Sequence, residues 1–140
     1  MNQPADAMIN AFNHLTIAVS DLDRAFDFYV SLLKFTPHAK WDKGAYLSVG
    51  DLWLCLSLDP KVTPRTDYTH FAFSARQGSF EAICQTLLTA GVQCWKENHS
   101  EGDSFYFLDP DGHKLELHVG TLQSRLESLK AMPYSGLILF

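Results

Sequence analysis

The stretch HLTIAVSDLDRAFDFYVSLL, from His14 to Leu33, decides the fold. Its first six residues alternate between two faces, which is typical of a β-strand. Ser20, with an acid three residues later at Asp23, is typical of a helix N-terminus. The apolar residues that follow recur at helical spacing, so a strand leads directly into an amphipathic helix. The face predicted to be buried consists of Leu22, Ala25, Phe26, Tyr29, Leu32 and Leu33.

The second half of the chain repeats this order. Residues 68–74 predict a strand, and apolar residues at helical spacing predict a helix that ends near Gly91. The tetrapeptide Asp-Pro-Asp-Gly at 109–112 predicts a tight turn, because Pro fixes φ and Gly accepts a positive φ. A closing helix is predicted at about 122–130. Short β runs follow each of the first two helices, at 35–41, 45–49 and 52–58 and then at 92–95, 104–108 and 114–119.

These elements predict an α+β fold built from two β-α-β-β-β modules in one domain. Module one spans about 11–58, module two about 67–120, and a C-terminal helix and tail occupy 121–140. Each module alone would expose one face of its sheet, so the pairing of two modules is the natural way to close a core. The spacing leaves open whether the modules pair within the chain or across a dimer.

Composition excludes several classes of protein. The chain has 140 residues, 46% of them hydrophobic, and a net charge of −5, which disfavours a nucleic-acid partner. No apolar run approaches the roughly 20 residues of a membrane span, and the N-terminus does not have the pattern of a secretory signal. The three widely spaced cysteines (Cys55, Cys84 and Cys94) are interpreted as buried thiols in a reducing cytoplasm.

Three residues suggest a metal site. His14 and His70 each open the first strand of a module, and Glu116 lies in an alternating strand where an inward-facing acid needs a partner. Two imidazoles and one carboxylate can bind a divalent metal and leave other coordination positions open for a reaction. The alternative is that the histidines are hydrogen-bonded residues at strand ends. His118 shares the strand face of Glu116 and is a candidate either to support a metal ligand or to replace one.

The polar stretch from Lys96 to Ser104 has two interpretations, a solvated hairpin loop or a set of oxygen donors for a hard cation. Lys96, and Arg125 on the closing helix, are candidate contacts for an anion. His38 and His99 are expected at the surface, and His113 in a turn. No nucleophile elbow, phosphate-binding glycine loop or CxxC motif occurs.

With these residues in view, the chain resembles the FosA-type fosfomycin-resistance glutathione transferases of the vicinal oxygen chelate superfamily. The resemblance covers nearly the whole chain from about Met8, so residues 1–7 are expected to be an N-terminal extension and 8–140 the domain. Either Met1 or Met8 is then the natural start. The blocks that carry the resemblance are 13–16, 41–47, 51–58, 67–70, 95–102 and 106–120.

The resemblance implies a domain-swapped homodimer in which each metal site draws ligands from both chains. It implies Mn²⁺ held by His14, His70 and Glu116. It also implies K⁺ held near the loop that contains Asn98, Ser100, Gly102 and Ser104.

The implied activity is the opening of the fosfomycin epoxide by the thiolate of glutathione, which gives antibiotic resistance. Thr16 would lie beside the oxirane and, with Tyr46, would act on the thiol proton. Trp41 and Tyr46 would line the route of glutathione. The implied substrate contacts are Lys96, Ser100, Tyr106 and Arg125 for the phosphonate, with Trp53 and Tyr68 close to the substrate.

Two departures from the family pattern occur: His99 stands where an Arg is expected, and the 59–66 loop is short. Three alternatives stay on the same fold: a fosfomycin epoxide hydrolase, a transferase using another thiol, and an Fe²⁺ extradiol dioxygenase. A metal-free drug-binding protein of the bleomycin-resistance kind is the alternative from another class. A purely structural protein would require the two histidines and Glu116 to lie apart.

Overall fold

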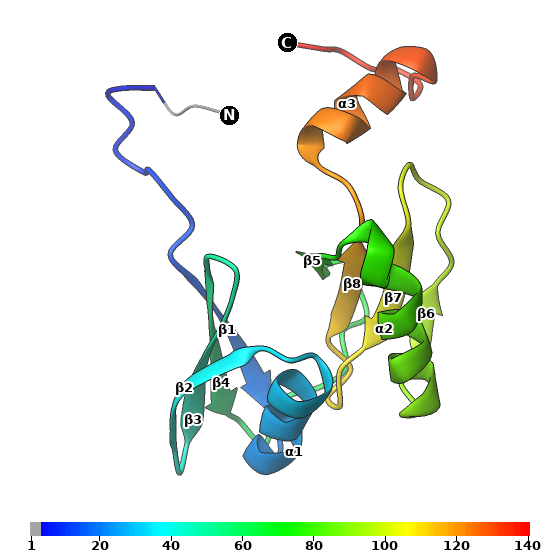
Figure 1. Cartoon of the computed structure of the whole chain (residues 1–140). Coiled ribbons are helices and arrows are strands. Elements are labelled where there is room, and N and C mark those ends of the chain that lie inside the picture. Colours follow the sequence, from blue (N-terminus) through cyan, green and yellow to red (C-terminus); the bar gives the residue numbers. More distant parts are fainter. Residues whose placement is uncertain (1–3) are drawn as a thin grey trace. The chain divides into compact units, whose positions relative to one another are not determined.

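A computed structural model describes residues 4–140, which form two compact units that divide between Val62 and Thr63. Each unit contains a four-stranded mixed sheet and begins in the order strand, helix, three strands (Figure 1). The predicted α+β fold with two β-α-β-β-β modules is therefore confirmed.

The first unit contains one sheet in the spatial order β1-β4-β3-β2. β1 runs parallel to β4, and the other neighbours are antiparallel. The parallel pair needs a crossover between its strands, and the helical segment after β1 begins it. The elements are β1 (His14–Val19), α1 (Leu22–Phe26), η1 (Asp27–Leu32), β2 (Thr36–Trp41), β3 (Gly44–Val49) and β4 (Leu52–Leu58).

The two faces of this sheet differ. One face is apolar and contacts α1, with Leu47, Leu54 and Leu56 almost fully buried. The opposite face, called the open face here, displays His14, Thr16, Tyr46 and Trp53, all exposed. Strand alternation separates the two sets. The candidate site residues therefore lie on the face that the helix does not cover.

The first helix differs from the prediction in two details. Its N-cap is Asp21 rather than Ser20, because Oδ1 of Asp21 accepts the hydrogen bond from the backbone N–H of Arg24 at 3.0 Å. Its second half is the π-helix η1, whose wider turn shifts the buried face. Phe28, which was not predicted, is buried beside Tyr29, whereas Leu32 is only half-buried.

The second unit has a sheet in the order β5-β8-β7-β6, with β5 parallel to β8. Leu87 of α2 is fully buried, as are Phe107 and Leu115 on the sheet. None of the helices in residues 4–140 has both the length and the apolar character to cross a membrane. The elements are β5 (Phe71–Ser74), α2 (Gln77–Thr89), β6 (Cys94–Lys96), β7 (Ser104–Leu108), β8 (Lys114–His118) and α3 (Leu122–Ala131).

β5 is shorter than predicted and leaves His70 just before the strand. Oδ1 of Asp67 accepts a hydrogen bond from the backbone N–H of Thr69 at 3.0 Å, which closes a local turn. That hydrogen bond lowers the pKa of Asp67 below its ordinary value. The predicted turn at 109–112 is present, with Gly112 at φ +83°.

The interpretation of all three cysteines as buried thiols is wrong for Cys94. Cys55 is buried, Cys84 is half-buried and Cys94 is exposed, because β6 is the edge strand of its sheet. Burial raises the pKa of the Cys84 thiol. All three cysteines are free thiols.

Candidate metal and substrate site

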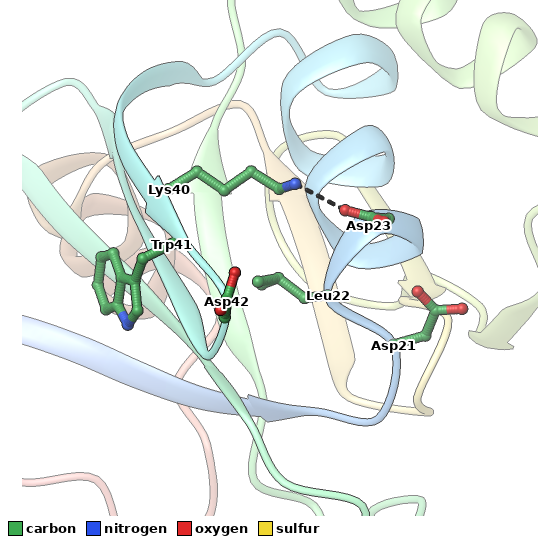
Figure 2. A pocket seen from close by; sticks show the side chains of 6 residues that line it. All are labelled: Asp21, Leu22, Asp23, Lys40, Trp41 and Asp42. Carbon is green, nitrogen blue, oxygen red and sulfur yellow. Dashed lines mark hydrogen bonds and ion pairs between the residues drawn. The ribbon is translucent and has the colours of Figure 1, made fainter.

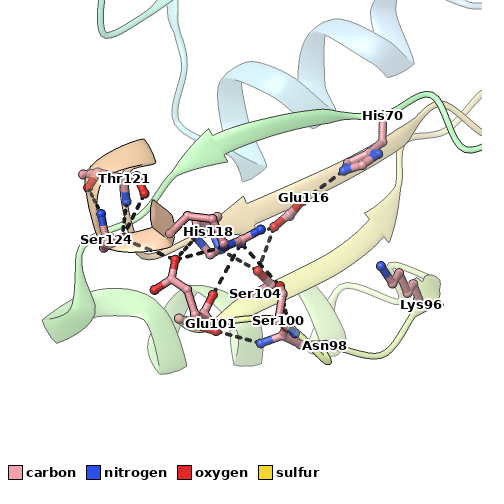
Figure 3. A network of polar contacts seen from close by, with 12 residues as sticks. His70, Lys96, Asn98, Ser100, Glu101, Ser104, Glu116, His118, Thr121 and Ser124 are labelled. Carbon is pink, nitrogen blue, oxygen red and sulfur yellow. Dashed lines mark hydrogen bonds and ion pairs between the residues drawn. The ribbon is translucent and has the colours of Figure 1, made fainter. Parts of the chain in front are cut away.

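Glu116 lies in the middle of β8, between Ala72 of β5 and Tyr106 of β7. Its side chain is 8% exposed, and a buried carboxylate requires hydrogen-bond partners. The hydroxyl of Ser104 donates to Oε2 at 2.7 Å, and Nε2 of His70 lies 3.1 Å from Oε1 (Figure 3). The carboxylate is therefore held at both oxygens.

The orientation of His70 suits metal ligation. Its Nδ1 lies 2.8 Å from the carbonyl oxygen of Tyr68, and a carbonyl only accepts, so Nδ1 carries the hydrogen. In the neutral imidazole, Nε2 then has a lone pair beside a carboxylate oxygen. Two acceptors this close need a cation between them, either a proton or a metal. An imidazole nitrogen and a carboxylate oxygen fit a divalent ion such as Mn²⁺.

The third predicted ligand, His14, belongs to the first unit. It is exposed at the start of β1, where Nδ1 contacts Oδ1 of Asn13 at 2.8 Å. Its ring lies 4.6 Å from that of Trp53, centroid to centroid. Within residues 4–140, no three His, Cys, Asp or Glu side chains are gathered in a way that could hold a metal. The structure thus pairs two of the three predicted ligands, and the full set stays a prediction.

Asn98 organises the loop predicted to hold K⁺. Its Nδ2 donates to the carbonyl oxygen of Gly102 at 2.7 Å, and its Oδ1 accepts from the backbone N–H and the hydroxyl of Ser100 at 3.0 and 3.1 Å. Gly102 has φ +76°, which favours glycine at this bend. Ser104, the fourth residue predicted here, contacts Glu116 instead.

The side-chain ammonium group of Lys96 lies on the same unit as Glu116. Nζ of Lys96 donates to the hydroxyl of Tyr68 and stands 4.7 and 4.9 Å from the ring centroids of Tyr68 and Tyr106. The hydrogen bond with Tyr68 raises the pKa of Lys96 above its ordinary value, so the ammonium form is favoured. Tyr106 is 4% exposed, while Tyr68 is exposed.

Arg125 is already paired. Nε of Arg125 lies 3.3 Å from Oε1 of Glu101, and Nη2 lies 3.4 Å from the hydroxyl of Ser100. The predicted anion contacts Ser100 and Arg125 therefore lie within hydrogen-bonding distance of each other. Glu101 was missed by the sequence analysis.

The open face of the first sheet is aromatic. The ring of Tyr46 lies 4.8 Å from that of Trp41 and 5.2 Å from that of Trp53, centroid to centroid. The strand register puts Thr16 and Tyr46 on either side of Cys55, in one row across three strands. The two residues predicted to act on the thiol thus lie on the same face.

A separate cavity of about 600 Å³ occurs in the first unit, beside the start of α1. Figure 2 shows Nζ of Lys40 turned toward Asp23, with which it forms an ion pair of 2.6 Å. Of its lining residues, only Trp41 was predicted to have a function. The lining consists of Asp21, Leu22, Asp23, Lys40, Trp41 and Asp42.

The remaining histidines divide as the sequence predicted. His38 and His99 are exposed, and His113 lies at the turn that precedes β8. His118, the second candidate, faces the polar network around Glu116. The signal for His118 was its spacing of two from Glu116 along one strand.

Residues 11–117 match the model of the glyoxalase/bleomycin resistance protein/dioxygenase superfamily, and the chain belongs to this superfamily. Within it, the chain is 54% identical over 135 residues to glutathione transferase FosA of Serratia marcescens, which covers 94% of this chain and 96% of that protein.

Two further relatives support this assignment. Metallothiol transferase FosB of Shouchella clausii is 40% identical over 126 residues, 85% of this chain and 86% of that protein. The crystal structure of the fosfomycin resistance protein FosX of Listeria monocytogenes, complexed with Mn(II) and sulfate, matches with a TM-score of 0.79. That match is 30% identical and covers 86% of this chain and 98% of that one. The comparisons confirm the resemblance to the FosA-type transferases, and with it the prediction of an enzyme.

Proposed function

We propose that this chain is a Mn²⁺-dependent, K⁺-stimulated glutathione transferase that opens the epoxide of fosfomycin and so gives resistance to it. The observation that carries the proposal is the approach of Nε2 of His70 to Oε1 of Glu116, on the unit that also presents the Lys96 ammonium group. Two side chains of the kinds that bind a divalent metal, together with the Lys96 ammonium group, would suit a small anionic substrate.

The ligands of Mn²⁺ would be His14, His70 and Glu116. When bound, the metal would supply Lewis-acid polarisation of the oxirane oxygen. The hydrogen bond from Nδ1 of His70 to Tyr68 fixes the imidazole in the form that ligates through Nε2. Ser104 restrains the other oxygen of Glu116.

The phosphonate needs positive charge, because the chain as a whole carries −5 and repels an anion. Lys96, Ser100, Tyr106 and Arg125 would bind it, with Trp53 and Tyr68 enclosing the rest of the molecule. The oxygens of Asn98, Ser100, Gly102 and Ser104 would hold K⁺, which would add a further positive charge nearby.

The residues of the open face would handle glutathione. Trp41 and Tyr46 would line its route, and Thr16 and Tyr46 would hold the thiol and take part in removing its proton. The new sulfur–carbon bond forms as the carbon–oxygen bond of the oxirane breaks. The oxygen then takes up a proton and ends as a hydroxyl, so the product is a glutathione adduct.

The assembly in this proposal is a cytoplasmic, domain-swapped homodimer, in which each metal site takes ligands from both chains. The domain would be 8–140 and residues 1–7 an extension. Modules 11–58 and 67–120 would be its pairing units, followed by the helix and tail at 121–140. His14 would then reach the pair formed by His70 and Glu116 from the partner chain.

The test is fosfomycin turnover by purified protein with Mn²⁺ and K⁺, with and without glutathione, with products identified by mass. An adduct that forms only with glutathione, and that disappears on chelation, supports the proposal. Addition of water instead would indicate an epoxide hydrolase, and an adduct only with another thiol would indicate a different transferase. Fosfomycin binding without metal or turnover would indicate a drug-binding protein.

A further inference from the structure

His118 belongs to a chain of polar contacts that leads through Ser104 to Glu116. Its Nδ1 lies 2.6 Å from Oγ of Ser104, and Oγ of Ser104 lies 2.7 Å from Oε2 of Glu116 (Figure 3). Ser104 of β7 and His118 of β8 are paired in the strand register, so the backbone itself holds the two side chains side by side. The proposed metal site takes no ligand atom from His118.

The direction of these hydrogen bonds follows from counting hydrogens. An ionised carboxylate only accepts, so the hydroxyl of Ser104 donates its single hydrogen to Glu116. The same hydroxyl must then accept from His118, which puts a hydrogen on Nδ1. Oε2 of Glu116 is thereby occupied by a donor, and Oε1 is the oxygen that faces His70.

Two glycines leave room for the His118 ring. A Cβ atom at Gly120 would come within 2.7 Å of Nε2 of His118, and one at Gly102 within 3.0 Å of Cε1 and in collision with the carbonyl oxygen of Val119. Both glycines have positive φ, +153° and +76°. The imidazole, 16% exposed, is therefore packed against bare backbone on two sides.

The far side of the ring faces a carboxylate. Oε1 of Glu101 lies 3.6 Å from Nε2 of His118 and also contacts Nε of Arg125 and the hydroxyl of Ser124, both at 3.3 Å. Ser124 in turn belongs to the capping box of α3. The imidazole thus has a defined contact at each nitrogen, and its position is tied to the end of a helix.

We propose that His118 is a positioning residue for Glu116, acting through the Ser104 hydroxyl to keep Oε1 available for a metal ion. This proposal rests on the assignment of Glu116 as a metal ligand in the proposed function. Partners that orient a ligand typically contribute 10- to 100-fold to metal affinity. The sequence suggested His118 either as a residue that supports a metal ligand or as a substitute ligand, and its contacts favour the supporting role.

The test compares two amides at position 118. The side-chain nitrogen of His118→Asn can occupy the place of Nδ1 and donate to Ser104, whereas that of His118→Gln reaches the place of Nε2. We expect Mn²⁺ affinity, titrated in K⁺-free buffer, to stay near that of wild type in His118→Asn and to fall roughly 10- to 100-fold in His118→Gln. His38→Gln, the same substitution at an exposed histidine whose Nε2 lies 2.7 Å from Oγ of Ser48, is the matched control and should leave affinity unchanged.

Ser104→Ala tests the same contact from the other side. It removes the hydrogen bond to Glu116 as well as the contact with His118, so it should lower Mn²⁺ affinity at least as much as His118→Gln does. Because His118 is proposed to act through Ser104, the double variant should lose no more than Ser104→Ala alone. In metal-free protein, NMR of the His118 ring should show a hydrogen on Nδ1 whose resonance shifts in Ser104→Ala. Additive losses, or a hydrogen on Nε2 alone, would overturn the proposal.

The proposed function can fail separately. If Glu116→Gln keeps full Mn²⁺ affinity, the ligand assignment is wrong, and the role of His118 falls with it. If Glu116→Gln loses affinity while His118→Gln and Ser104→Ala keep it, only the positioning role is wrong.

Discussion

Nε2 of His70 and Oε1 of Glu116 lie 3.1 Å apart, and with a neutral imidazole and an ionised carboxylate neither atom carries a hydrogen. Nδ1 of His70 donates to the carbonyl of Tyr68, so the neutral ring presents a lone pair at Nε2. The structure therefore contains one imidazole nitrogen and one carboxylate oxygen arranged to share a cation.

Replacement of Glu116 by Gln should weaken Mn²⁺ binding at least 10- to 100-fold, about the effect of disturbing the surroundings of a metal ligand. The amide keeps the shape of the side chain and removes its charge. Titration of Mn²⁺ by electron paramagnetic resonance measures the change. Glu127→Gln, on the exposed side of α3, is the matched control. Equal affinities for the two variants would contradict the metal assignment.

Lys96→Met should reduce kcat/KM for fosfomycin roughly 10- to 100-fold, mainly through KM. A hydrogen bond to a charged group contributes about 1.5–3 kcal/mol, and methionine keeps the packing against the rings of Tyr68 and Tyr106 without the charge. Steady-state kinetics at varied fosfomycin concentration separates the two constants. Lys130→Met, which removes an exposed partner of Glu127, should leave both constants unchanged. If the two variants behaved alike, Lys96 would have no part in anion binding.

The sequence grouped His70 with Glu116 among the candidate ligands of one metal site, and the structure brings these two side chains within 3.1 Å of each other. Alternation along β8 put Glu116 on the face opposite Leu115 and Leu117, and the internal repeat put His70 at the start of the neighbouring strand. Both signals are local patterns in the sequence. Strand pairing then brings the two residues side by side. His14 was identified by the same repeat, and its role remains a prediction.

Other features depend on contacts that no local pattern encodes. The burial of Phe28 follows from the π-helical turn of η1, which a helical period of 3.6 does not predict. Glu101 reaches His118 and Arg125 because Gly102 bends the loop at a positive φ. Polar loop residues have no periodicity. The contacts of Glu101 with His118 and Arg125 therefore became visible only in the structure.

The packing of α2 can be tested on two adjacent leucines. Leu87 is fully buried and Leu88 is 49% exposed. Leu87→Ala should lower the free energy of unfolding by about 2–5 kcal/mol, because it leaves a cavity against the sheet. Leu88→Ala should change it by about 0.5 kcal/mol. Urea denaturation followed by circular dichroism measures both, and similar losses would show that α2 packs by another face.

The carboxyl group of Asp67 should titrate below the ordinary range for aspartate. The hydrogen bond from the backbone N–H of Thr69 favours the ionised form and lowers the pKa in the folded protein. Its contribution to stability is therefore complete above the unfolded-state pKa and is lost as the pH falls through the lower, folded-state pKa. Carboxyl ¹³C NMR measures the pKa directly. Arg65→Gln should leave it depressed, because the charge of Arg65 is a lesser cause; recovery of the ordinary pKa in that variant would contradict the assignment.

Gly112 and Gly91 allow backbone strain to be separated from collision. Both have nearly the same φ, +83° and +84°, so an alanine at either position costs about 1–2 kcal/mol for the left-handed conformation. A Cβ atom at Gly91 would meet no atom within 4 Å, whereas one at Gly112 would lie 2.7 Å from Cβ of Pro64. Gly112→Ala should therefore destabilise the protein by about 1–3 kcal/mol more than Gly91→Ala. Equal losses in urea denaturation would mean that the segment around Pro64 moves away from the turn without cost.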